Sequence, residues 1–134
     1  MREVRLLGPR GQVFRAELPQ TRLERVRGWR GRAAVAPDDA LLLDRARSIH
    51  TFGMCVPIWA ALLDRELVVR SVRPVRPGRL VLPRPGTRHV LECAVGVDLR
   101  PGDRLRIVKG YWEGPGGRPL YFPALPPGRG RGAA

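Results

Sequence analysis

The sequence predicts a mostly β (α+β) fold, a small single-domain β-barrel-like arrangement of short strands with one short N-terminal helix and a Gly/Pro-rich C-terminal tail. The chain has 134 residues, which suits one domain. Its apolar runs are short and are separated by Gly and Pro, as in small β-barrels. A single segment carries clear start and stop signals of a helix.

The first two strands are expected at Val4–Leu7 and Val13–Leu18, joined by a Gly-Pro-Arg-Gly turn. In the second strand Phe14, Ala16 and Leu18 alternate with more polar residues, so they should face the interior.

The helix is expected to begin at Thr21, because Glu24 follows three positions later and completes a capping box. Gly28 supplies the stop signal. Leu23 and Val26 are then expected to form the buried face of a helix of about two turns.

Further strands are predicted by apolar runs between turn residues. Leu41–Leu43 is continuously apolar, which is typical of a strand buried on both faces. The run after Ile58 and the run after Leu67 should form a hairpin. The predicted strands are Ala40–Asp44, Ile49–Val56, Ile58–Leu63, Leu67–Val72, Leu80–Leu82, His89–Val95 and Arg104–Val108.

The compact domain is expected to span residues 1–109, and residues 110–134 differ in kind. This extension contains 7 Gly and 5 Pro, which disfavour any regular element. It also carries aromatic residues that either fold back onto the domain or bind a partner, with residues 127–134 expected to be disordered. These aromatic residues are Tyr111, Trp112, Tyr121 and Phe122.

The net charge of +13 would suit binding to a nucleic-acid phosphate backbone, but the types of basic residue that supply this charge favour a coding bias as its origin. Of the 25 basic residues only Lys109 is lysine, and the chain has no asparagine, as expected from GC-rich coding. The arginines are scattered along the chain, so nucleic-acid association is a secondary alternative.

No signal segment follows Met1, and the apolar stretch 52–63 is too short for a membrane span. A cytoplasmic location is therefore expected.

Residues 48–58, followed by Leu62-Leu63-Asp64, resemble the domain of unknown function 192 family. The segments 90–92 and 99–103 fit the closing strand and turn of that family in the same order. The resemblance covers roughly residues 12–108. It implies a small, mostly-β domain without an established biochemical activity. The family aspartate that follows Pro-Ile is replaced by Trp59, so any chemistry of that aspartate would be lost.

His50, Met54 and Cys55 are the candidates for chemistry. An imidazole can take the proton of a thiol, so His50 and Cys55 could serve a hydrolase-type enzyme. The three side chains together could bind a soft metal ion, with Cys93 as a fourth ligand or as a disulfide partner of Cys55. As a strand, residues 50–56 would place Cys55 on the opposite face from the other two. Buried packing is the favoured interpretation of these residues.

A second polar set could line a barrel mouth and bind a small ligand, although turn capping and surface ion pairs are the favoured roles. Its members are Asp64, Arg76, Arg79, Glu92 and Asp103. No phosphate-binding loop is evident, so no cofactor is expected. The sequence therefore favours a non-catalytic binding or accessory domain that contacts a protein or small molecule. Its contact surface would be the segment His50–Trp59, with Trp59 as an anchor, and the aromatic tail.

Overall fold

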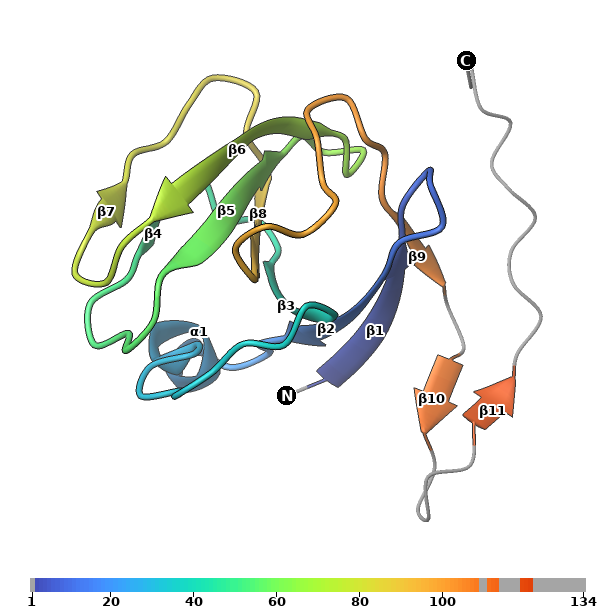
Figure 1. Ribbon diagram of the computed structural model, residues 1–134, viewed down its shortest axis with the longest axis horizontal. Coiled ribbons are helices and arrows are strands. Elements are labelled where there is room, and N and C mark those ends of the chain that lie inside the picture. Colours follow the sequence, from blue (N-terminus) through green and yellow to red (C-terminus); the bar gives the residue numbers. More distant parts are fainter. Residues whose placement is uncertain (1, 109–110, 114–118, 122–134) are drawn as a thin grey trace.

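Seven strands form one mixed sheet in the computed structural model, which describes residues 2–108, 111–113 and 119–121 (Figure 1). The strand order is β6-β5-β8-β3-β2-β1-β9, and every neighbouring pair is antiparallel except β2 and β3. The strands are β1 (Arg2–Leu7), β2 (Val13–Leu18), β3 (Asp39–Leu43), β5 (Ile58–Leu63), β6 (Val69–Val75), β8 (His89–Cys93) and β9 (Arg106–Val108).

The two ends of the sheet approach each other but do not form a continuous ladder. The segments before β6 and β9 are joined by one isolated bridge, Val68 to Arg104. Next to it the Val69 amide donates to the Asp103 carbonyl at 2.8 Å. The prediction of a mostly β fold with one short helix is confirmed, whereas the sheet is not closed into a barrel.

Apolar side chains pack on both faces of the sheet, and the central strand β3 serves both. Leu42 belongs to the cluster that contains Phe14 and Ala16, while Leu41 and Leu43 belong to the cluster on the other face. The predictions of a doubly buried strand at 41–43 and of inward-facing Phe14 and Ala16 are therefore confirmed. The predicted hairpin of β5 and β6 is confirmed as well.

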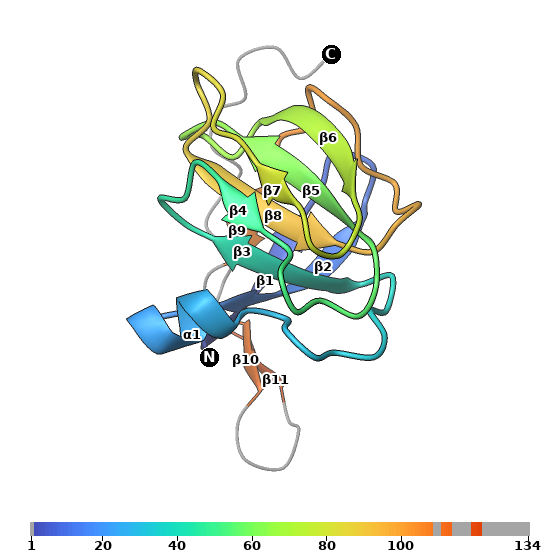
Figure 2. The same ribbon diagram turned by 90° about the vertical axis from the view of Figure 1, so that its left-hand side faces the viewer.

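Residues 49–56 do not form the continuous strand that their apolar character predicts. Only β4 (Ile49–His50) is extended, and it pairs with β7 (Leu80–Val81). The chain then turns at Gly53, whose φ is +81°. The short pair β4–β7 and the helix lie at the end of the molecule away from β9 (Figures 1 and 2).

The helix α1 (Arg22–Arg27) lies in the crossover between the parallel strands β2 and β3. The predicted capping box is present, since the Glu24 amide donates to Thr21 Oγ1 at 3.1 Å and the Thr21 amide donates to Glu24 Oε1 at 3.0 Å. The predicted buried face is wrong, because Leu23 is 72% exposed and Val26 is 54% exposed. Trp29, two residues beyond the helix, is buried instead and anchors the crossover.

Two short strands of the C-terminal extension are described, β10 (Tyr111–Glu113) and β11 (Pro119–Tyr121), and they pair antiparallel. The prediction that residues 110–134 lack a regular element is wrong for these two strands. The predictions for Phe122 and for residues 127–134 fall outside the described residues. In the described part of the chain, no helix has the length and apolar character that crossing a membrane requires.

Candidate binding pocket

A cavity of about 430 Å³ lies between α1 and the sheet face that carries Leu41. We call it the α1 pocket. Its buried lining is apolar and comprises Trp29, Leu41, Leu43, Ile49 and Met54. Its outer lining is basic and aromatic and includes Arg22, Arg25, Arg27, Arg30, His50 and Phe52. An apolar cavity of this size with few polar groups is typical of a small-molecule site.

Thr51 positions the loop that forms one wall of the α1 pocket. Its side chain is fully buried, and its Oγ1 donates to the Arg76 carbonyl at 2.6 Å while accepting from the Arg79 amide at 2.9 Å. Its backbone carbonyl accepts from the Gly78 and Met54 amides. These bonds fix the loop between β4 and β5 against the loop between β6 and β7, so His50, Phe52 and Met54 are held beside the cavity.

Gly53 joins this loop to the turn after α1. The Gly31 amide donates to the Gly53 carbonyl at 3.1 Å, and Arg30 Nε donates to the Phe52 carbonyl at 3.4 Å. A Cβ at position 53 would lie 2.6 Å from Arg30 Nε, and the positive φ also favours glycine. The absence of a side chain here lets the two walls of the pocket meet.

Glu92 is the acidic residue that lines the α1 pocket. It lies on β8, paired across the sheet with Leu41 on β3 and Ala60 on β5, so its side chain shares their apolar face. It is 4% exposed, and no hydrogen bond or ion pair reaches its carboxyl from the described residues. This burial raises the pKa of Glu92 to about 7 from an ordinary 4.5.

A second buried polar group, on a residue that lines the same pocket, also lacks a partner. Trp29 is 3% exposed, and its Nε1 has no acceptor within the described part of the chain. The guanidinium of Arg32 lies over the Trp29 ring, 5.1 Å from its centroid, and holds the indole in place. Trp29 Nε1 is itself enclosed by protein atoms, so the unpaired carboxyl of Glu92 is the buried polar group that the pocket offers to a ligand.

The four arginines at the mouth differ in their availability. Arg25 is held by Asp44, with Nη1 donating to Oδ1 at 3.0 Å and Nη2 to the carbonyl at 2.8 Å. Arg30 is held by the Phe52 carbonyl. Arg22 and Arg27 form no side-chain hydrogen bond or ion pair with the described residues. Two cations thus remain available at the entrance.

The residues proposed for catalysis or metal binding are only partly brought together. His50 is exposed and stacks on Phe52 with ring centroids 5.2 Å apart, and Met54 is buried at the pocket wall. Cys55 is exposed and does not line the pocket, and Cys93 is a buried free thiol whose pKa burial raises to about 12. Among the described residues, no three His, Cys, Asp or Glu side chains group as a metal site would need.

Trp59, Asp64 and Arg76 lie away from the α1 pocket. Trp59 pairs with Cys93 across the sheet and packs against the cluster on the opposite face from Glu92. Asp64 caps the β5–β6 turn by accepting from the Glu66 and Val68 amides. Arg76 is exposed in the loop after β6. The structure thus joins His50, Met54 and Glu92 and separates these other three predicted site residues.

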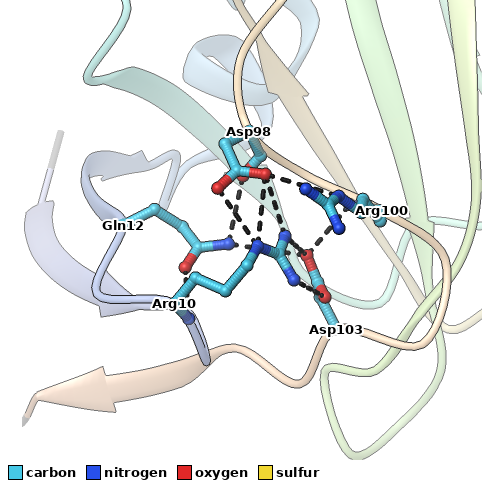
Figure 3. Close-up of polar contacts among 5 residues, drawn as sticks. All are labelled: Arg10, Gln12, Asp98, Arg100 and Asp103. Atoms are coloured by element: carbon cyan, nitrogen blue, oxygen red, sulfur yellow. Dashed lines mark hydrogen bonds and ion pairs between the residues drawn. The ribbon is translucent and has the colours of Figure 1, made fainter.

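Asp103 belongs to a different cluster that fastens the β1–β2 turn to the loop before β9 (Figure 3). Arg10 donates to both Asp103 carboxyl oxygens, at 2.8 and 2.6 Å, and also to Asp98. The Arg100 amide donates to Asp103 at 2.9 Å. These bonds, chiefly those from Arg10, lower the pKa of Asp103. The cluster is fully paired and lies outside the α1 pocket.

Two important residues of the pocket were not found from the sequence as site residues. The sequence around Thr51 carries no signal of its role, because the hydrogen-bond partners of its hydroxyl come from residues 76–79. Trp29 carries a signal, since a bulky aromatic residue directly after a helix stop is available to anchor that helix.

The profile of the family described as "Uncharacterized ACR", the domain of unknown function 192 family, matches residues 5–107, and the chain belongs to this family. No curated protein matches the chain. Two solved structures share its fold. A protein of unknown function from Novosphingobium aromaticivorans has a TM-score of 0.66 and 21% identity, covering 78% of this chain and 83% of that one. A "putative transcription regulator" from Sinorhizobium meliloti has a TM-score of 0.64 and 24% identity, covering 78% and 92%.

Proposed function

We propose that this member of the domain of unknown function 192 family is a small, non-catalytic binding domain that takes a compact small molecule into the α1 pocket. The observation that carries the proposal is the unpaired, buried carboxyl of Glu92 on the floor of an apolar cavity. A carboxyl in that position weakens the fold unless a bound molecule pairs with it.

The surroundings of Glu92 support a small molecule as the occupant. The pocket is concave, with a mostly apolar buried lining, one buried carboxyl and a basic outer lining, which suits the recognition of a small ligand. The wall 49–54 includes the His50–Met54 part of the segment that the sequence singled out. Trp59 packs on the other face of the sheet and has no part in this site.

The remaining assignments are part of the same proposal. Residues 1–109 form the binding domain, and residues 110–134 are an extension that adds a contact for a partner through its aromatic residues. The domain works in the cytoplasm, where thiols stay reduced, in keeping with the free Cys55 and Cys93.

A fragment screen by two-dimensional amide NMR tests the proposal. Fragments that bind should shift the amides of residues 28–30, 49–54 and 92. The variant Ser48→Trp, which fills the mouth, should abolish those shifts. Val95→Trp, a substitution at an exposed site outside the pocket, should keep them. A screen in which no fragment reaches the pocket amides would refute the proposal.

A second candidate function is acid–base catalysis in the same pocket. A carboxyl whose pKa lies near 7 is suited to proton transfer, and His50 lines the same cavity. A hydrolase screen at about pH 7 tests this candidate, with Glu92→Gln as the variant expected to be inactive. Activity that depends on Cys55 alone would instead support the cysteine nucleophile.

Nucleic-acid association is a third candidate, supported by the charge of +13 and by the name of the Sinorhizobium meliloti structure. It predicts DNA or RNA binding that weakens steeply as salt rises. Binding that is absent at physiological ionic strength would rule it out.

A further inference from the structure

We propose that the α1 pocket selects a compact hydroxy acid, with a hydroxyl bound at Glu92 on the floor and an anionic group held by Arg22 and Arg27 at the mouth. This inference rests on the binding function proposed above and adds the chemical class of the ligand.

The floor of the pocket calls for a group that both donates and accepts hydrogen bonds. The Glu92 carboxyl only accepts when it is ionised, and it both donates and accepts when it carries its proton. A hydroxyl can pair with either form through one atom. A carboxylate only accepts and would face a like charge at an ionised Glu92, and an ammonium group would meet the positive charge of the four arginines that line the pocket.

The mouth of the pocket calls for an anion. Four arginines line the pocket against the single acidic residue Glu92, which lies on the buried floor. Arg25 and Arg30 are already held by Asp44 and by the Phe52 carbonyl, and they still contribute positive charge. Arg22 and Arg27 are available to pair with a carboxylate or phosphate. A cationic group at the mouth would be repelled by all four.

The space between floor and mouth calls for a flat apolar body. The walls are Leu41, Leu43, Ile49 and Met54, with the rings of Trp29 and Phe52. A volume of about 430 Å³ accommodates one ring with a short side chain. A hydroxyl at one end of such a ring and an anion at the other would match the floor and the mouth together.

Four probes that share one skeleton test each end separately by calorimetric titration. Para-hydroxyphenylacetate carries both groups, phenylacetate lacks the hydroxyl, tyrosol replaces the carboxylate with an alcohol, and tyramine replaces it with an ammonium. We expect para-hydroxyphenylacetate to bind about tenfold more tightly than phenylacetate or tyrosol, since each lacks one good hydrogen-bonding partner. Tyramine should show no binding.

Matched variants assign each loss to its residue. Glu92→Leu should bind para-hydroxyphenylacetate and phenylacetate equally, and it should fold because it removes an unpaired buried acid. The double variant Arg22→Gln with Arg27→Gln should bind para-hydroxyphenylacetate no better than tyrosol. Arg84→Gln, an exposed arginine outside the pocket, should behave as the native chain does.

The outcomes separate this inference from the function on which it rests. Equal binding of para-hydroxyphenylacetate and phenylacetate by the native chain overturns the hydroxyl assignment, and a preference for tyramine overturns the anion assignment. Either result leaves the pocket a binding site. If none of the four probes binds while fragments of other chemistry shift the pocket amides, the hydroxy-acid class is wrong and the binding function stands. If neither probes nor fragments bind, both fail.

Discussion

The burial of Glu92 makes the stability of the fold depend on pH. Its pKa is raised from 4.5 to about 7 by burial, so the folded state holds a proton that the unfolded state has released in that interval. Stability should therefore fall as the pH rises from about 4.5 to about 7 and should level off above it. A residue that weakens its own fold in this way is placed for a ligand rather than for stability.

Glu92→Gln isolates this effect. Relative to the native chain, the variant should gain about 3 kcal/mol of unfolding free energy as the pH rises from about 4.5 to about 8. Urea denaturation across that pH range measures the gain. The control Glu66→Gln removes a carboxylate at an exposed turn position, so it measures what the loss of a surface charge alone does to stability. A pH-independent difference for Glu92→Gln would contradict the assignment of a protonated, unpaired carboxyl.

Thr51 shows how one hydroxyl supports a loop. Thr51→Val keeps the shape of the side chain but leaves the Arg79 amide and the Arg76 carbonyl without their partner. We expect a loss of about 2 kcal/mol in chemical denaturation, and weaker binding of any pocket ligand, because the wall 49–54 loosens. Thr51→Ser keeps the hydroxyl and should retain most of the stability. Equal stability of the two variants would show that the hydroxyl does not hold the loop.

At the scale of elements, the cluster of Arg10, Asp98 and Asp103 links the β1–β2 turn to the loop that precedes β9 (Figure 3). Asp103 is 6% exposed and is bonded by Arg10 and by the Arg100 amide, whereas Asp98 is exposed. Arg10 lowers the pKa of Asp103. The ionised Asp103 therefore stabilises the fold at pH values above 3.8, the ordinary pKa of an aspartate. That contribution is lost as the pH falls through the lower folded value.

Asp103→Asn should therefore destabilise the protein by about 2 kcal/mol at neutral pH, through the loss of charge-assisted hydrogen bonds. The difference from the native chain should shrink in acid. Asp98→Asn, at the exposed partner in the same cluster, is the matched control and should have a smaller effect because solvent screens it. Urea denaturation of both variants at neutral and acidic pH measures this, and equal losses would mean that burial does not distinguish the two carboxyls.

The elements also show what the sequence could predict and what it could not. Local signals were sufficient for the capping box at Thr21 and for the doubly buried run 41–43. The periodicity of α1 does not reveal that Trp29 replaces Leu23 and Val26 as the buried contact, because that choice depends on the position of the sheet. The strand predicted at 49–56 is interrupted by hydrogen bonds from Thr51 to residues 76–79, which no local pattern contains.

The same reasoning applies to the site. His50, Met54 and Glu92 were each predicted as binding residues, and the α1 pocket brings them together. The sequence predicts Glu92 as one residue of an alternating strand. The pairing of β8 with both β3 and β5, which the sequence does not reveal, is what buries its carboxyl. The convergence of these residues with the arginines of α1 follows from the β2–α1–β3 crossover, which is a property of the topology.

At the scale of the whole molecule, Cys93 reports on opening of the sheet. Cys93 lies fully buried on β8, beside the central strand β3, and burial raises its thiol pKa to about 12, so the folded protein protects it from alkylation. Cys55 is exposed and should react at once. In the variant Cys55→Ser, labelling of Cys93 should therefore proceed only through unfolding.

The rate of that labelling connects the pocket to global stability. A molecule that binds only the folded state should slow Cys93 labelling by the factor one plus the ratio of ligand concentration to Kd, which is about hundredfold at a hundred times Kd. Para-hydroxyphenylacetate is the probe, and the Glu92→Leu variant is the control, in which phenylacetate should protect Cys93 equally well. Mass spectrometry of alkylated protein gives the rates. Rapid labelling of Cys93 in native buffer would show that the centre of the sheet opens locally, and ligand in the α1 pocket would then leave the rate unchanged.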